Sequence, residues 1–453
     1  MKKKKGLLTA DAQRKRMLEK PIPPLVTALA IPGMISQLVT VIYNMADTYF
    51  VSQIGTSAAA AIGVVFSLQS IVQAFGFGLG TGVGSLVSRS LGAKKDEQAI
   101  CYANSAIFAG FVLGISVLGV GLFFLKELMI LLGSTPTMLD YSMTYATWIL
   151  LSAPFLCMSC VMNMILRSEG EAVLAMIGIS TGGVLNALMD PVLIFHFEMG
   201  IRGAALSTFI SQGVSFFLLS GMFLAGKSVL PLRLQGVSHQ KKIYYDIITT
   251  GVPTISRQGM ASVGTALLTI IASRYGDATV AAITISNKIY LFVRNLVLGV
   301  GQGFQPVAGF NYGAKRYGRT KEAFIFATEV GSLLCVMAAL LIGWQAEGVI
   351  GWFRNDPAVI AVGKEALFYA CLVMPFMAFS TYVNQLYQCL GFKVQATLLA
   401  CCRNGFFLIP VLAVLPSFFG MTGLLAAQPL ADLLTFFISI PFLIGFFKWK
   451  LQS

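Results

Sequence analysis

Charge is what this sequence has least of. Only 11% of its 453 residues are Asp, Glu, Lys or Arg, whereas a soluble protein carries about 25%. Hydrophobic residues make up 56% of the chain, and the mean hydropathy is +0.78. This composition excludes a soluble globular domain. It predicts an all-α polytopic membrane protein, whose organisation is counted in membrane spans rather than in domains.

Motifs for catalysis and redox chemistry are also scarce. The chain has only two histidines, and no Ser, His or Cys constellation accompanies its carboxylates, which argues against an enzyme. Of the eight cysteines, Cys157 and Cys160 form a single Cys-x-x-Cys pair, which we interpret as small core residues. The sequence contains no Walker A pattern, which argues against ATP-driven transport, and we expect no cofactor. The glycine-rich run 76–84 lies inside an apolar segment and predicts close helix packing.

The polar N-terminal segment is followed by twelve apolar segments of spanning length. The first is too long for a signal peptide and has no small-residue cleavage site, so we expect it to remain as a span. Several segments exceed the ~20 residues that a bilayer requires, which permits tilt. The predicted spans are 24–51, 58–86, 99–125, 141–165, 173–195, 203–225, 247–273, 279–306, 323–345, 362–388, 394–414 and 423–446.

The net charge of +13 is distributed unevenly between the two sides of these spans. Such an imbalance is the expected excess of Lys and Arg on cytoplasmic loops, and it requires no nucleic-acid partner. We therefore predict a multi-pass protein of the plasma membrane with both termini in the cytoplasm. Basic residues on the predicted cytoplasmic side are Arg89, Lys94, Lys95, Arg167, Lys227, Arg233, Lys241, Lys242, Lys315, Arg316, Arg319, Lys321, Lys393, Lys448 and Lys450.

The sequence repeats itself with an offset of 221 residues. Ile31-Pro32 matches Val252-Pro253, and Gly92-Ala-Lys-Lys95 matches Gly313-Ala-Lys-Arg316. Each repeat holds six spans, so the two halves share one orientation and are related by an axis along the membrane normal. The predicted division is 1–23 cytoplasmic, 24–225 first six-helix lobe, 226–246 cytoplasmic linker, 247–446 second six-helix lobe and 447–453 cytoplasmic tail.

Asp190 is the most unusual residue of the first repeat, because it lies near the end of an otherwise uncharged span. A carboxylate at that place costs ~2.5–3.5 kcal/mol on insertion scales, and such residues usually face a protein-lined cavity. Asn186 lies one helical turn earlier on the same face, and Pro191 obstructs the helix immediately afterwards. These side chains predict half of a proton or hard-cation site. The alternative is a buried aspartate that is capped by its neighbours.

Asp47 provides a second carboxylate at similar depth. It lies near the outer end of the first span, and Thr208 lies early in the sixth span, at the same side of the membrane. Two carboxylates with an amide and a hydroxyl suit Na⁺, which takes oxygen ligands, and they also suit a shared proton. The repeat equivalent of Asp47 is Leu268, so the site belongs to the first half alone.

Several motifs spread over nearly the whole chain occur together in this sequence. They are Ile31-Pro32, Tyr43-Asn-Met-Ala-Asp47-Thr48, Gly78 to Ser88 leading into Leu91-Gly-Ala-Lys94, Asn186-x-x-x-Asp190-Pro191, Gly203-Ala-Ala-Leu-Ser-Thr208 and Pro306-x-x-x-Phe310-Asn-Tyr-Gly313. With this combination the sequence resembles the MATE family of multidrug and toxic-compound extrusion transporters. The resemblance implies two six-helix lobes around a central substrate cleft, with efflux driven by Na⁺ or H⁺. It also implies a cation site at Asp47, Asn186, Asp190 and Thr208.

The second half differs in carrying basic residues inside its spans. Acidic residues expected there are Glu329 and Asp432, and neither lies in a matching motif. The basic residues either extend to the membrane surface and bond backbone carbonyls, or line the cleft and attract anionic or zwitterionic substrates. They are Arg257, Lys288, Arg294 and Arg403, and the candidate cleft residues are Gln73, Arg257, Gln258 and Arg294.

We therefore predict a secondary active multidrug antiporter, acting as a monomer in membrane lipid. It exports amphipathic drugs or metabolites in exchange for Na⁺ or H⁺. A flippase for lipid-linked glycan precursors and a metabolite exporter are alternatives of related fold. A channel or signalling receptor is an alternative of a different class, and exchange kinetics would exclude it.

Overall fold

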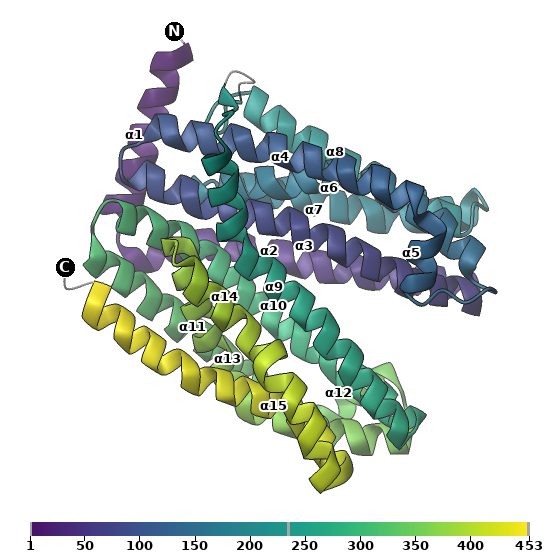
Figure 1. Cartoon of the computed structure of the whole chain (residues 1–453). Coiled ribbons are helices and arrows are strands. Elements are labelled where there is room, and N and C mark those ends of the chain that lie inside the picture. Colours follow the sequence, from purple (N-terminus) through teal and green to yellow (C-terminus); the bar gives the residue numbers. More distant parts are fainter. Residues whose placement is uncertain (1, 233–235, 451–453) are drawn as a thin grey trace. The chain divides into compact units, whose positions relative to one another are not determined.

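The computed structural model describes residues 2–232 and 236–450, and all regular structure within these residues is helical (Figure 1). Arg233, which we placed on a cytoplasmic loop, lies outside the described residues. The spans of the first repeat are α2 (Ile22–Ser52), α3 (Thr56–Gly92), α4 (Asp96–Phe123), α6 (Leu139–Ser168), α7 (Ala172–Pro191) with the π-helical turn η1 (Val192–His196), and α8 (Ile201–Leu224). Those of the second repeat are α9 (Lys241–Ala272), α10 (Asp277–Gly313), α11 (Tyr317–Trp344), α13 (Pro357–Leu390), α14 (Lys393–Cys401) with η4 (Cys402–Phe407), and α15 (Leu408–Lys450).

The number of spans agrees with the predicted twelve once the stretch Lys393–Lys448 is divided in two and the helix α9 is added. Ten helical stretches of the described residues are long and apolar enough to cross a membrane. The stretch Lys393–Lys448 contains two of the predicted spans, which are divided at Gly420, where φ is 58°. The 32-residue helix α9 is not among the ten, because its basic start and Arg257 lower its apolarity. The predicted all-α polytopic fold is thereby confirmed.

Short helices that were not predicted lie outside the spans. They are α1 (Lys2–Glu19), α5 (Leu125–Leu131), α12 (Ala346–Phe353) and the 3₁₀ turn η3 (Ser273–Tyr275). The basic N-terminal segment is therefore helical rather than extended. Arg14 anchors it, because its side chain is buried, donates to the carbonyl of Leu91 at 2.9 Å and forms an ion pair with Asp96.

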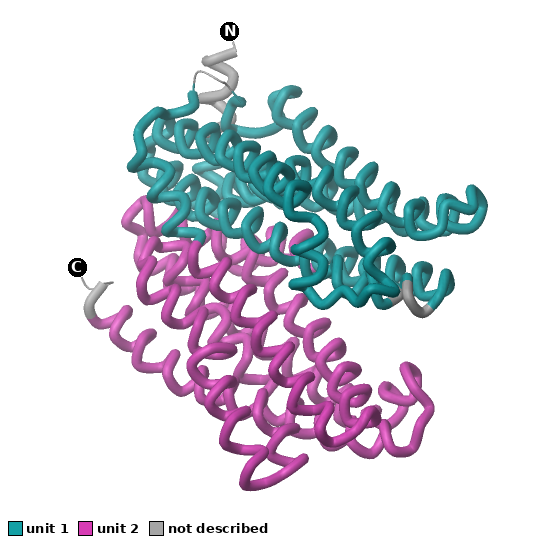
Figure 2. The backbone as a smooth tube through the Cα atoms, turned by 45° about the vertical axis from the view of Figure 1, so that its right-hand side comes forward, with its two compact units in different colours: residues 1–20, 35–251 teal, residues 21–34, 252–453 magenta. Residues whose placement is uncertain are grey.

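The chain forms two compact units, one of residues 1–20 and 35–251 and the other of residues 21–34 and 252–453 (Figure 2). The division falls inside α2 and inside α9. The first part of each of these helices therefore packs with the helices of the other repeat. We call this arrangement the helix exchange; charge and hydropathy give no sign of it. The predicted lobe boundaries follow the loops between spans, and they remain a prediction.

Glycines of α3 make the exchange possible. A Cβ atom on Gly82 would lie 2.3 Å from the carbonyl oxygen of Ile247 on α9, whereas one on Gly80 would lie 2.8 Å from Met164 on α6. Successive glycines of the run thus serve two faces of one helix. The prediction that this run mediates close helix packing is confirmed, because only glycine allows two backbones to approach so closely.

The second repeat reproduces this packing at equivalent positions. On α10, a Cβ atom on Gly303 would lie 2.4 Å from the backbone nitrogen of Ala30 on α2. Gly303 and Ala30 are the repeat equivalents of Gly82 and Gly251. The helices α3 and α10 are both 37 residues long, and Lys94 and Lys315 after them both have left-handed φ angles, 61° and 59°. The internal repeat is therefore present in the structure as well as in the sequence.

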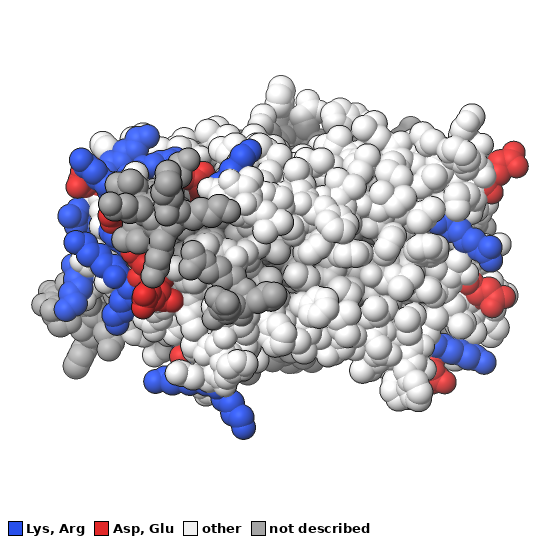
Figure 3. All heavy atoms as spheres, turned by 90° about the horizontal axis from the view of Figure 1, so that it is seen from above, with Lys and Arg blue, Asp and Glu red and all other residues white. Residues whose placement is uncertain are grey.

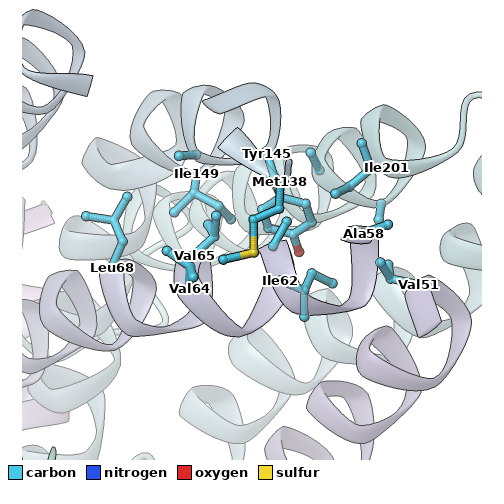
Figure 4. Close-up of a cluster of buried hydrophobic side chains, with 14 of the residues drawn as sticks. Val51, Ala58, Ile62, Val64, Val65, Leu68, Met138, Tyr145, Ile149 and Ile201 are labelled. Carbon is cyan, nitrogen blue, oxygen red and sulfur yellow. The ribbon is translucent and has the colours of Figure 1, made fainter. Parts of the chain in front are cut away.

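An apolar cluster at one end of the first unit joins α3 to α6 (Figure 4). Val65 and Leu68 of α3 pack with Ile149 and the ring of Tyr145 on α6, and all four side chains are buried. This cluster holds these ends of the helices in place. It also fixes the ring of Tyr145, whose hydroxyl reaches the polar site described next.

Candidate cation site

Asp190 and Asn186 lie on one face of α7, as their spacing predicts. Both side chains are buried, and the Nδ2 atom of Asn186 donates to Oδ1 of Asp190 at 3.3 Å. Regular α-helix ends at Pro191, and the chain continues as the π-helical turn η1. A proline and a π-bulge are the common causes of an irregular transmembrane helix, and π-bulges occur frequently at functional sites.

Thr208 is brought to this pair by α8, together with Ser207. The Nδ2 atom of Asn186 lies 3.1 Å from Oγ of Ser207 and 3.3 Å from Oγ1 of Thr208. The hydroxyl of Ser207 in turn donates to the backbone oxygen of Asn186 at 3.2 Å. An amide nitrogen carries two hydrogens, and here three acceptors share them. The amide can therefore change its partners without leaving the site.

Asp47 joins the network through Tyr145. The tyrosine hydroxyl donates to Oδ2 of Asp47 at 3.1 Å and lies 3.4 Å from Oγ1 of Thr208. A continuous polar chain thus runs from Asp47 through Tyr145, Thr208 and Asn186 to Asp190. The structure brings together all four predicted cation-site residues, within the first unit.

Sequence reasoning missed Tyr145 and Ser207. A tyrosine in an apolar run is common, and only its position near the end of its span that lies at the level of Asp47 could have drawn attention to it. Ser207 lies beside Thr208 in the sequence, but a helical wheel alone does not show that both hydroxyls reach one amide. These contacts depend on how α6, α7 and α8 pack.

Each carboxylate keeps one oxygen available. Oδ1 of Asp47 and Oδ2 of Asp190 are buried, and neither has a hydrogen-bond partner among the described residues. Among the described residues, no group of three or more His, Cys, Asp or Glu side chains lies close enough together to hold a metal ion. The ligand set is therefore two carboxylates and neutral oxygens, which suits a proton or a hard cation such as Na⁺ rather than a soft metal.

The second unit contains a different polar cluster, formed by Arg403, Asp432 and Tyr290. Arg403 on η4 forms an ion pair with Asp432 on α15, with side-chain exposures of 14% and 5%. The hydroxyl of Tyr290 on α10 donates to Oδ2 of Asp432 at 2.6 Å and accepts from Nη2 of Arg403 at 2.9 Å. Arg403 therefore bonds a carboxylate 29 residues away, rather than the backbone carbonyls that one of our two alternatives expected.

The remaining candidate cleft residues are divided between the units. Gln73 lies on α3 of the first unit, and Arg257, Gln258 and Arg294 lie on α9 and α10 of the second; all four are half-buried. Their role in a substrate cleft remains a prediction. Glu365 on α13 is a further acidic residue of a predicted span that we had overlooked, and it accepts from the Tyr369 hydroxyl at 3.4 Å.

Comparisons with known proteins agree with this architecture. A family model described as MatE matches residues 32–192 and again residues 253–414, which places one copy of the family unit on each repeat. Two solved structures have the same fold. "Crystal structure of MATE in complex with MaL6" has a TM-score of 0.91 at 23% identity and covers 96% of this chain and 98% of that one. A MOP superfamily transporter from Pyrococcus furiosus, described as having a binding pocket of reverse polarity, has a TM-score of 0.91 at 23% identity over 97% of this chain and 98% of that one.

Curated relatives are similar over most of the chain. "Multidrug export protein MepA" of Staphylococcus saprophyticus is 28% identical over 407 residues, which are 89% of each protein. The protein of the same name from Staphylococcus aureus is 26% identical over 426 residues, 93% of each. The family model covers well over half of the sequence, and the helices form the same fold as the solved relatives. The chain therefore belongs to the MatE family of multi-pass membrane transporters.

Proposed function

We propose that this protein exports amphipathic organic compounds in exchange for Na⁺ or H⁺. The coupling ion binds at Asp47, Asn186, Asp190 and Thr208. One observation carries the proposal: two carboxylates, each with a buried oxygen that lacks a partner in the described chain, are connected by one continuous hydrogen-bond network. The names of the curated relatives, which are multidrug export proteins, support export as the direction of transport.

Coupling follows from the energetic cost of the carboxylates. An ionised carboxylate in a membrane interior is expensive, and a bound cation or proton removes that cost. An ion that binds one conformation more tightly than another shifts the population toward it by its difference in binding free energy. Because Tyr145, Thr208 and Asn186 connect the two carboxylates, neutralising one changes the hydrogen bonds available to the other. A rearrangement of α2, α7 and α8 follows from ion binding in this way.

The proposed orientation places both termini in the cytoplasm of a cell whose plasma membrane holds the protein as a monomer. The distribution of charge supports it. In the view of Figure 3, Lys and Arg side chains gather mainly at one end of the helices, and the broad surface between the ends is uncharged. A basic end facing the cytoplasm and an uncharged band facing lipid are what insertion with this orientation produces.

The test is export from proteoliposomes with a Na⁺ gradient or an H⁺ gradient imposed separately. A tenfold gradient supplies about 1.4 kcal/mol per ion, which supports about a tenfold substrate gradient for one-to-one exchange. We expect one of the two gradients to drive export in the wild type. Asp47→Asn and Asp190→Asn should each abolish the gradient-driven component, and Tyr145→Phe should weaken the apparent affinity for the ion.

The matched control is Asp140→Asn, which removes an exposed carboxylate at the start of α6. It should transport at the wild-type rate. Asp47→Asn and Asp190→Asn should insert at least as well as the wild type, because neutralising a carboxylate inside the membrane lowers the cost of insertion. Wild-type export by either Asp47→Asn or Asp190→Asn, or a wild type that leaks substrate regardless of both gradients, would contradict the proposal.

A further inference from the structure

The interior of the second unit contains more positive charge than it can compensate. Its helices carry Arg257 on α9, Arg294 on α10 and Arg403 on η4. Asp432 on α15 forms an ion pair with Arg403 and lies within electrostatic range of Arg294. Two positive charges of the three are therefore left over. Unpaired cations are costly inside a membrane protein unless they serve a ligand or a path.

Three hydrogen bonds already use most of the acceptor capacity of Asp432, which is about four lone-pair positions. Its Oδ1 atom is taken by Nε of Arg403, and its Oδ2 atom accepts from the hydroxyl of Tyr290 and from Nη2 of Arg403, at 2.6 and 3.3 Å. The guanidinium of Arg403 also lies over the ring of Tyr290, 5.2 Å from its centroid. These contacts satisfy Arg403 and Asp432 together and hold Tyr290 in one position.

Arg294 lies near the cluster of Tyr290, Arg403 and Asp432. Tyr290 and Arg294 are one helical turn apart, so they share a face of α10. Arg294 is within electrostatic range of Arg257 as well as of Arg403 and Asp432. Arg257 and Arg294 are half-buried, and no hydrogen bond or ion pair to either is found among residues 2–232 and 236–450. Two guanidinium groups thus lie within electrostatic range of each other, and their N–H groups have no acceptor among the described residues.

We propose that Arg257 and Arg294 form an anion-binding subsite for the exported compound, which selects amphipathic molecules bearing a carboxylate over permanent cations. A guanidinium presents five N–H donors in a planar fork that matches a carboxylate. An anion also relieves the repulsion between the two arginines. This inference rests on the proposed export function for its biological meaning. It does not depend on which ion drives export.

The test compares two forms of one dye that differ only at the carboxylate. A rhodamine with a free carboxylate and the methyl ester of the same rhodamine share their aromatic system and cationic amine. Binding to the purified full chain in non-ionic detergent is followed by fluorescence anisotropy, with no gradient imposed. We expect the wild type to bind the free acid about tenfold more tightly than the ester, as one charge-assisted contact provides.

Arg257→Gln and Arg294→Gln should each weaken binding of the free acid by about tenfold and leave the ester unchanged or bound more tightly. Arg257→Lys and Arg294→Lys keep the charge and should retain part of the preference. The matched control is Lys288→Gln, which removes an exposed cation from the same helix α10. It should leave the ratio of the two affinities unchanged.

Three results would overturn the proposal: a wild type that prefers the ester, an equal loss of affinity for both dyes in the arginine variants, or an equal loss of preference in Lys288→Gln. A melting curve of each variant identifies any that are misfolded, and the lysine variants then decide. Failure of ion-driven export in liposomes would leave these binding ratios untouched, so the two proposals fail separately.

Discussion

Gly82→Ala tests the helix exchange directly. The added methyl carbon would lie 2.3 Å from the carbonyl oxygen of Ile247 and 3.0 Å from the backbone nitrogen of Gly251. A carbon and a carbonyl oxygen normally stay about 3.3 Å or more apart, so α3 and α9 would have to separate by about 1 Å. Because both obstacles are backbone atoms, no change of side-chain rotamer can relieve the clash.

The expected cost is that of overpacking, about 1–3 kcal/mol and occasionally more. It exceeds the gain of about 0.5–1 kcal/mol that alanine brings to a helix through its better propensity. We therefore expect Gly82→Ala to lower the melting temperature in detergent by several degrees. Gly303→Ala should behave alike, because its methyl carbon would lie 2.4 Å from the backbone nitrogen of Ala30.

The control is Gly119→Ala on α4, where a Cβ atom would meet nothing within 4 Å. It should leave the melting temperature unchanged or slightly raised. Melting temperatures of Gly82→Ala and Gly303→Ala that equal that of Gly119→Ala would refute the reasoning. In that case the close approach of the backbones would not limit stability.

Two further predictions concern buried charge. Burial raises the pKa of Glu169, which lies between α6 and α7, to about 8, although hydrogen bonds from Ser228 and from two backbone N–H groups oppose the shift. The folded chain then keeps a proton that the unfolded chain releases above about pH 4.5, so the free energy of unfolding should fall as the pH rises from there through about 8. Melting temperatures measured between about pH 6 and 9 should show this slope in the wild type and a flatter slope in Glu169→Gln. Equal slopes in the two proteins would contradict the prediction. Arg403→Leu should destabilise the protein by about 3–5 kcal/mol because it leaves Asp432 buried and unpaired, whereas Arg403→Leu with Asp432→Leu should recover most of that loss; a double variant no more stable than the single one would be inconsistent with the ion pair.

The spans and the cation site could be predicted because their signals are local or periodic. Apolar runs of spanning length specify helices in a membrane whatever their neighbours are. Asp190 and Asn186 can be recognised because they are polar residues one turn apart in such a run. The 221-residue offset allows the spans predicted in one half to be compared with those in the other. The helix bounds extend past the predicted spans mainly because polar ends such as Asp96 and Lys241 stay helical outside the bilayer.

The features that could not be predicted depend on packing between distant segments. The helix α1 has no apolar periodicity of its own, and Arg14 holds it by partners more than 70 residues away. Arg403 lies on η4 and Asp432 lies on α15, and their side chains meet through the packing of these two segments. No spacing rule connects positions on separate helices, so such a pair appears only once the helices are packed.

The exchange of helix segments also bears on how the protein is made and where its two repeats came from. The first unit is incomplete until residues 241–251 of the second repeat emerge from the ribosome, and residues 21–34 wait without their partners until α10 has been inserted. Neither six-helix repeat can therefore complete its own core. An ancestral six-helix protein with this exchange would have existed only as a pair of copies, each lending the start of its first helix to the other. Fusion of two such genes would have turned a reciprocal swap between subunits into a link within one chain.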